Sequence, residues 1–162
     1  MNQFPDFIEA KHGGATIWLE RSLFGPAMMN SLANPDAIFA APDCVMIKDQ
    51  IKIRVARVRL PAAQFTAPVY VKRYNAFSWR YRIQSFFSRS GALRSLRGAA
   101  ILRNAGVATA SPLAAVEVRL WGMLASSFYL SKEIIAAKTA DPYWLENLKT
   151  ISGKVGLHRR RR

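Results

Sequence analysis

The chain has 162 residues, of which 51% are hydrophobic, so it is long enough and apolar enough to bury the core of one domain. A single cysteine, Cys44, excludes an intrachain disulfide and a zinc site built from cysteines. The formal net charge is +14, and no acidic residue occurs between Asp49 and Glu117. This excess of positive charge favours polyanionic partners such as nucleic acid, nucleotide phosphates, anionic lipid or phosphorylated glycolipid. A basic protein without such a partner has the same composition.

Residues 1–43 are rich in turn residues and are interpreted as an N-terminal extension. Within it, Ile17-Trp18-Leu19 is consistent with either a strand or a helical turn. The first residues carry no basic stretch followed by an apolar run, so no secretory signal is predicted. No apolar run approaches the ~18 residues that span a bilayer, and we expect a soluble or peripheral protein.

Three short β-rich runs follow. Residues 44–48 form the first, residues 51–55 alternate apolar and basic side chains, and residues 69–74 form the third. The alternation shifts by one position after Val55, which predicts a bulge or the end of that strand. Together the three runs predict an antiparallel meander.

The next segments predict helices. Residues 77–87 mix aromatics with arginines and are interpreted as helical. Ser90 is a suitable N-cap for a second helix through Asn104, and Gly106 is a suitable stop.

Two more strands are predicted at residues 112–118 and 123–130, joined by a turn near Trp121-Gly122. Pro142 suits the first turn of a last helix that ends near Ser152. The order of strands and helices predicts an α+β protein.

Three segments resemble the lipopolysaccharide kinases of the Kdo/WaaP type, which are relatives of the protein kinases. Val69-Tyr70-Val71-Lys72-Arg73-Tyr74 resembles their third strand. The run from Ser90 to Pro112 resembles their helix and its exit, and residues 127–133 resemble the fifth strand leading to the nucleotide hinge. The resemblance covers residues 44–158. It implies a protein-kinase-like N-lobe of about five antiparallel strands plus helices over 44–135. Residues 136–162 would then hold the start of the first C-lobe helix and a basic tail.

The resemblance also implies roles for individual residues in binding ATP with Mg²⁺. Lys72 would hold the inner phosphates, which need a fixed cation on a rigid strand. Glu133 and the residues after it would face the adenine edge, and Val55 with Ile53 would cover the base. Each residue also has an ordinary interpretation: a lysine that discourages pairing at a sheet edge, a solvated glutamate at a strand end, and aliphatic core residues.

The sequence departs from the family pattern in three places. No glycine lies between Pro26 and Ser90, so the glycine-rich phosphate loop is missing. In the family, the helix that corresponds to residues 90–104 supplies an acid that pairs with the strand lysine, but here these residues contain no acid. Lys72 therefore lacks this partner unless Glu117 or Glu133 takes its place.

The third departure concerns catalysis. Leu157-His158 resembles the pair that precedes the family's catalytic loop, but four arginines follow it here. We therefore predict no catalytic residue, no metal site and no kinase turnover for this chain alone. The arginines suit a polyanion-binding tail or the product of a shifted reading frame, and the second interpretation is favoured because the similarity ends there.

The first functional hypothesis is therefore a truncated lipopolysaccharide-kinase-like protein. Its intact relative would phosphorylate a core sugar of lipopolysaccharide, Kdo or heptose, in the cytoplasm or peripherally at the inner membrane. The alternative is a non-catalytic, pseudokinase-like basic module that binds nucleic acid or anionic lipid, in which the aromatics of residues 77–87 stack on bases. Those aromatics equally suit an ordinary helix-packing face. A non-functional gene remnant is a third hypothesis.

Overall fold

The structure is a computed structural model that describes residues 4–60, 67–76, 78–86 and 88–134, except for the side chain of Tyr81. The elements in chain order are β1 (Phe7–His12), β2 (Ala15–Glu20), the 3-10 helix η1 (Arg21–Leu23), α1 (Pro26–Ala33), the 3-10 helix η2 (Pro35–Ala40), β3 (Val45–Asp49), β4 (Ile53–Val58), β5 (Val69–Asn75), α2 (Trp79–Gln84), α3 (Gly91–Asn104), β6 (Pro112–Leu120) and β7 (Met123–Lys132).

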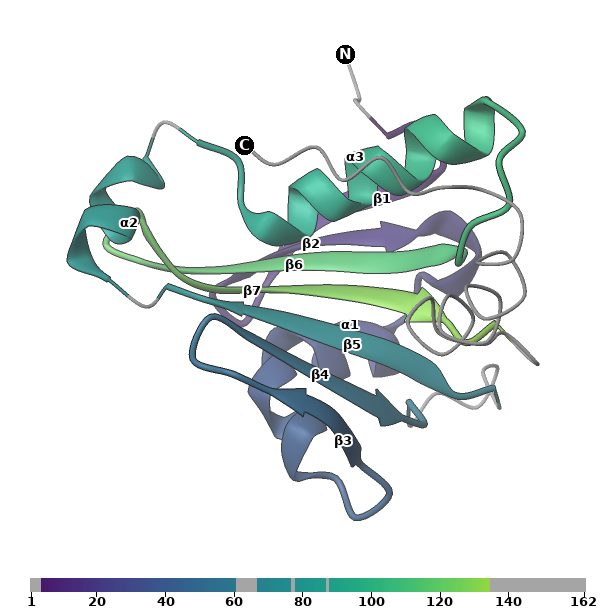
Figure 1. The fold of residues 1–162 in the computed structure, drawn as a ribbon, viewed down its shortest axis with the longest axis horizontal. Coiled ribbons are helices and arrows are strands. Elements are labelled where there is room, and N and C mark those ends of the chain that lie inside the picture. Colours follow the sequence, from purple (N-terminus) through teal and green to yellow (C-terminus); the bar gives the residue numbers. More distant parts are fainter. Residues whose placement is uncertain (1–3, 61–66, 77, 87, 135–162) are drawn as a thin grey trace, which may run out of the picture.

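The strands form one seven-stranded sheet in the order β1-β2-β6-β7-β5-β4-β3 (Figure 1). Every neighbouring pair is antiparallel. The chain is therefore an α+β protein, as the sequence predicted at that level. The five strands predicted after residue 43 are all present in the sheet.

Two strands were not predicted. The segment at Ile17-Trp18-Leu19, left open between a strand and a helical turn, lies in β2. β1 and β2 form a hairpin around Gly13-Gly14, and β2 pairs with β6. Residues 7–20 thus extend the sheet from five strands to seven.

The predicted break after Val55 takes a different form. β4 continues to Val58, and the irregularity lies in its partner β3, where the register shifts between Met46 and Lys48. Met46 faces Ala56 while Lys48 faces Val55, so Ile47 is the extra residue. The helix predicted to start at Pro142 and the basic tail fall outside the described residues.

One face of the sheet packs against α1 and η2, and we call it the α1 face. Alternate residues of the central strands point to this side because side chains alternate along a strand. Its core holds sixteen buried residues, from strands, helices and connections: Ala15, Ile17, Leu19, Met28, Met29, Leu32, Ile38, Val58, Leu60, Val69, Val71, Leu113, Ala114, Val116, Phe128 and Leu130. This cluster is the main core of the described chain.

The opposite face packs against α3, and we call it the α3 face. A smaller cluster joins Ala92 and Leu96 of α3 to Phe7 and Ala115 of the sheet. As predicted, Ser90 is the N-cap of α3, and its hydroxyl accepts a hydrogen bond from the Leu93 amide. At the other end, Gly106 has φ +72 just beyond the helix, which suits the predicted stop.

The helices are short. The longest one in the described ranges, α3, has 14 residues. None of these helices combines the length and the apolar character that crossing a bilayer requires.

Candidate functional site

Lys72 lies in the middle of the sheet and on its α3 face. β5 runs between β7 and β4, so Lys72 does not guard an edge. It pairs with Val55 of β4 on one side and with Tyr129 of β7 on the other. Because directly paired residues point to the same face, Val55, Lys72 and Tyr129 form one row across three strands. Tyr129 packs against the cluster beneath α3, which fixes the face of the whole row.

The surroundings of Lys72 contain rings and hydroxyls. Its ammonium Nζ lies 5.1 Å from the ring centre of Tyr74, within cation–π range. The Tyr74 hydroxyl lies 2.6 Å from the Ser95 hydroxyl of α3. Among the described residues no carboxylate forms an ion pair with Lys72. The α3 helix thus places a serine near the tyrosine beside Lys72, and it contains no acid.

Tyr129, next to Lys72 in the row, keeps its phenol protonated and uncharged at neutral pH. Burial raises the pKa of its phenol to about 12, because the charged form would lose its hydration. Tyr129 therefore adds no negative charge beside Lys72 at neutral pH.

Glu133 follows β7 and is held by its own contacts. Arg57 of β4 donates two hydrogen bonds to its carboxylate, Nε to Oε1 at 2.7 Å and Nη2 to Oε2 at 2.9 Å. These bonds lower the pKa of Glu133, with a smaller contribution from the Tyr70 hydroxyl. The Glu133 amide donates to the Pro68 carbonyl at 3.2 Å. Both the side chain and the amide of Glu133 are therefore engaged within the chain.

The structure brings the three predicted site residues to one part of the α3 face. Val55 is a direct neighbour of Lys72, and Val55 is half-buried outside both core clusters. Glu133 forms an ion pair with Arg57, and Arg57 pairs with Tyr70 in the row next to that of Lys72. Arg57 and Tyr70 were not identified from the sequence. The signal was available, because Arg57 lies two residues from Val55 and Tyr70 two residues from Lys72, the spacing of side chains that share a face.

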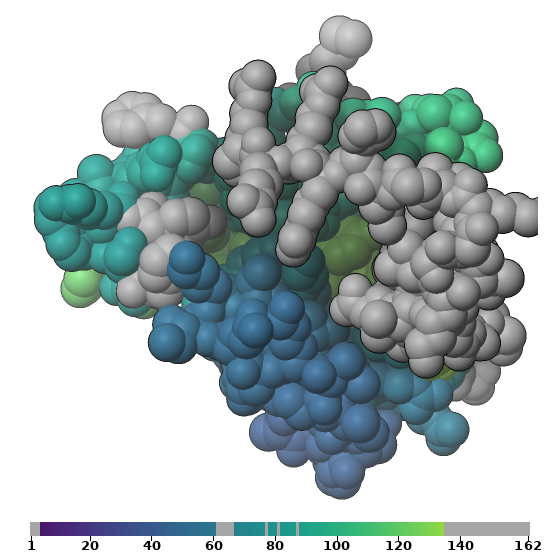
Figure 2. Space-filling view, viewed as in Figure 1, coloured from purple at the N-terminus to yellow at the C-terminus, as the bar shows by residue number. Residues whose placement is uncertain are grey.

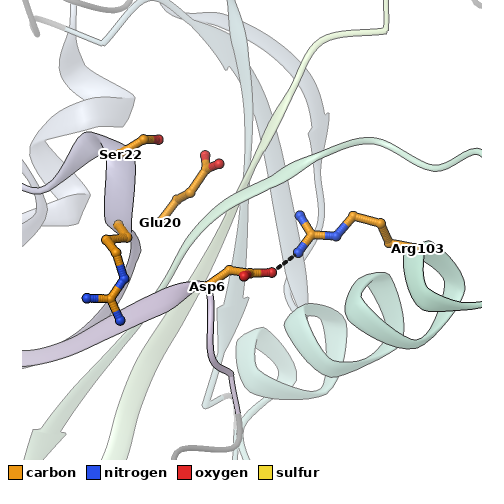
Figure 3. A pocket seen from close by; sticks show the side chains of 5 residues that line it. Asp6, Glu20, Ser22 and Arg103 are labelled. Atoms are coloured by element: carbon orange, nitrogen blue, oxygen red, sulfur yellow. Dashed lines mark hydrogen bonds and ion pairs between the residues drawn. The ribbon is translucent and has the colours of Figure 1, made fainter.

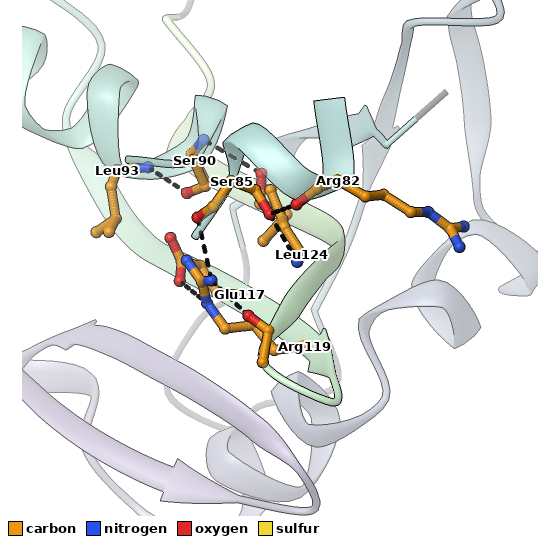
Figure 4. Close-up of polar contacts among 10 residues, drawn as sticks. Arg82, Ser85, Ser90, Leu93, Glu117, Arg119 and Leu124 are labelled. Carbon is orange, nitrogen blue, oxygen red and sulfur yellow. Dashed lines mark hydrogen bonds and ion pairs between the residues drawn. The ribbon is translucent and has the colours of Figure 1, made fainter. Parts of the chain in front are cut away.

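Glu117, considered as a substitute partner for Lys72, lies elsewhere on the sheet. Its side chain is buried and its Oε2 accepts a hydrogen bond of 2.9 Å from Nε of Arg119 (Figure 4). Its other oxygen, Oε1, has no hydrogen-bond partner among the residues that the structure describes. Glu117 is therefore committed to Arg119.

An open depression of about 400 Å³ lies between the start of β1, η1 and the end of α3. Asp6, Glu20, Arg21, Ser22 and Arg103 line it, and Asp6 forms an ion pair with Arg103 (Figure 3). Opposite charges balance within it, and none of the predicted site residues belongs to it. In the parts of the chain described above, no three His, Cys, Asp or Glu side chains lie together as a metal site requires.

No protein-family model, no curated protein and no solved structure matches the chain.

Proposed function

We propose that this chain is the nucleotide-facing lobe of a phosphotransferase similar to the lipopolysaccharide Kdo/WaaP kinases. In this proposal Lys72 binds the inner phosphates of ATP, and Val55 lies against the nucleotide. The observation that carries it is the row Val55–Lys72–Tyr129. It sets a lysine in the centre of a sheet beneath a helix, and no carboxylate of the described residues forms an ion pair with it.

The arrangement of the elements supports the proposal. The segments that resemble the family, in β5, α3 and β7, all meet around Lys72. A lysine on a central strand loses little further entropy when a phosphate binds, because its backbone is fixed on both sides. With no carboxylate paired to it among the described residues, its charge is available to an anion.

The fit to ATP and the fit to Mg²⁺ differ. Lys72 and Val55 provide a cation and an apolar contact, which phosphates and a base require. The described residues provide no group of carboxylates for Mg²⁺, so we assign no step to a metal. Phosphoryl transfer also needs a base to accept the proton of the acceptor hydroxyl. We therefore propose nucleotide binding without turnover for this chain, and transfer to a core sugar of lipopolysaccharide for a protein that has the missing residues.

The test is the binding of Mg²⁺-ATP to the chain by isothermal titration calorimetry. Lys72→Met keeps the aliphatic stem and removes the charge, so we expect affinity to fall about tenfold or more, as for one lost ionic contact. Lys11→Met, at an exposed position on the opposite edge strand β1, is the matched control and should bind as the parent does. Transfer of labelled phosphate to lipopolysaccharide should be absent in both.

Two results contradict the proposal. The first is equal affinity in the Lys72→Met and Lys11→Met variants. The second is displacement of ATP by polyuridine at the same phosphate concentration, which identifies a site for any polyanion. Phosphate transfer that disappears with Lys72→Met would instead overturn the prediction that the chain lacks turnover.

A second candidate is a basic module that binds a polyanion without chemistry. The net charge of +14 and the acid-free stretch from residue 50 to residue 116 favour it. Salt-sensitive binding of RNA with no preference for ATP would distinguish it from the first.

A further inference from the structure

Five large apolar side chains are exposed at one end of the sheet, where α2 lies beside the turn between β6 and β7 (Figure 1). We call them the aromatic tip: Trp79, Ile83, Phe86, Leu120 and Trp121. Their exposed fractions range from 49% for Ile83 to 94% for Trp121. In Figure 2 the teal segment that contains α2 projects from the body of the molecule, with green atoms of the later strands beside it. A group of this kind on a projecting end marks an interaction site.

Trp121 occupies a position that does not suit tryptophan. Leu120 pairs with Met123, so Trp121 and Gly122 form a two-residue hairpin turn with φ values of 49° and 81°. Such turns favour asparagine, aspartate or glycine, because a left-handed backbone strains a bulky residue. The side chain gains no packing in return, since it is almost fully exposed. Neither the turn nor the core accounts for tryptophan at this position.

The turn is tied to the end of α2 by a partly buried polar network (Figure 4). Arg119 donates hydrogen bonds to the carbonyls of Ser85, at 3.3 Å, and Gly122, at 3.0 Å. Glu117 holds the same guanidinium, and the Leu124 amide donates to the Ser85 hydroxyl at 3.0 Å. The part of the aromatic tip at α2 and the part at the β6–β7 turn are therefore fixed relative to each other.

Phe86 joins the two parts directly. Its ring lies where a side chain at Gly122 would be, 2.9 Å from the position of a Cβ. The absence of a side chain at Gly122 thus lets Phe86 pack onto the turn.

The charge beside the aromatic tip is positive. Arg80 and Arg82 of α2 are exposed, and the guanidinium of Arg80 lies 5.7 Å from the Trp79 ring centre. Neither arginine takes part in the ion pairs of the described residues. No acid occurs in the sequence from residue 50 to residue 116 to neutralise them.

We propose that the aromatic tip docks on the surface of an anionic lipid bilayer. Trp121 and Leu120 would enter the interfacial region, where tryptophan is favoured, and Arg80 and Arg82 would contact lipid phosphates. A projecting end that mixes aliphatic with aromatic side chains suits lipid better than RNA, which prefers aromatic platforms within a basic groove. This inference stands on the tip alone and does not depend on nucleotide binding at Lys72.

The test is co-sedimentation of the full chain with vesicles of phosphatidylcholine, with or without phosphatidylglycerol. Trp121→Asn replaces the tryptophan with a residue that prefers the same left-handed turn, so the fold should be kept. We expect this variant to lower partitioning onto the anionic vesicles about tenfold. The double variant Arg80→Gln/Arg82→Gln should lower it about fivefold per arginine, and should leave binding less sensitive to salt.

The controls are Ile101→Asn and Arg97→Gln on α3, which remove an exposed apolar and an exposed basic residue away from the tip. All variants keep the four C-terminal arginines, whose attraction to anionic vesicles is therefore the same in each. Unchanged binding by Trp121→Asn, or an equal loss in Ile101→Asn, would overturn the proposal. So would a Trp121→Asn variant that keeps its vesicle binding but loses polyuridine, because the tip would then be an RNA surface.

Discussion

Arg57 and Glu133 connect two strands that are not neighbours in the sheet. β5 lies between β4 and β7, and Tyr70 of β5 pairs with Arg57 in register. The ion pair therefore spans a strand on the α3 face, close to the row that carries Lys72. Because the arginine contacts both carboxylate oxygens, the pair is more specific in geometry than an ordinary surface pair.

The lowered pKa of Glu133 predicts an acid-sensitive contribution to stability. The folded pKa lies below the unfolded value, so this contribution is present above the unfolded pKa and is lost as pH falls through the folded pKa. We expect Glu133→Gln to be less stable than the parent at neutral pH, with a difference that shrinks on acidification. Urea unfolding midpoints over this pH range measure it. Glu20→Gln makes the same substitution at another partly exposed glutamate and is the control. A stability difference between Glu133→Gln and the parent that stays constant across this pH range would contradict the expectation.

At the scale of the element, α3 begins where it does for two local reasons. Ser90 caps the helix, and Gly91 lets its first turn lie against the Tyr74 ring. A Cβ at Gly91 would lie 2.6 Å from that ring, closer than real contacts allow. The capping serine was predicted from the sequence. The requirement for glycine was not, because it depends on β5, which is distant in the chain.

Two glycines of α3 should therefore respond to alanine in opposite ways. Gly91→Ala should destabilise the fold by about 1–3 kcal/mol, as overpacking does. Gly98→Ala meets no atom within 4 Å and should stabilise it by about 0.5–1 kcal/mol, because alanine is the better helix former. Thermal and urea unfolding of both variants measure this. The same sign of change at both positions would contradict the account.

The elements predicted best were those with local signals. Apolar and polar side chains alternate along β5, Ser90 caps α3, and Gly122 lies in the β6–β7 turn. β1 was not predicted and β2 was left open between a strand and a helical turn, because β2 is stabilised by pairing with β6, about 100 residues later. The bulge was assigned to the wrong strand for a related reason. A shift in alternation shows that two strands fall out of register, but only the pairing shows that Ile47 is the extra residue.

On the scale of the whole molecule, residues 4–43 belong to the packed structure. β2 covers the edge of β6, and Ile17, Leu19 and Leu32 are among the most buried side chains of the main core. For the candidate site, Lys72 was chosen because its strand resembles the third strand of the family, whereas its place on the α3 face follows from the strand pairing. The sequence did not identify the ion pair of Glu133, which depends on the order of strands in the sheet.

A chain that begins at residue 44 should therefore fail to fold cooperatively. It would expose the β6 edge and a large part of the main core to water. We expect it to lack the sharp thermal transition of the parent in circular dichroism. Ile17→Ala in the full chain is a milder control and should cost about 2–5 kcal/mol while keeping the transition. A cooperative transition in the shortened chain would show that residues 1–43 are dispensable.

The row through Lys72 extends further than the site. Val55, Lys72, Tyr129, Ala115, Trp18 and Glu9 are paired in succession across six strands. A deletion of one residue within β5 would turn Lys72 toward α1 and Val71 toward α3, because the two faces exchange at every step along a strand. Evolutionary change in length is therefore expected in the connections of this chain, while its inner strands vary by substitution alone.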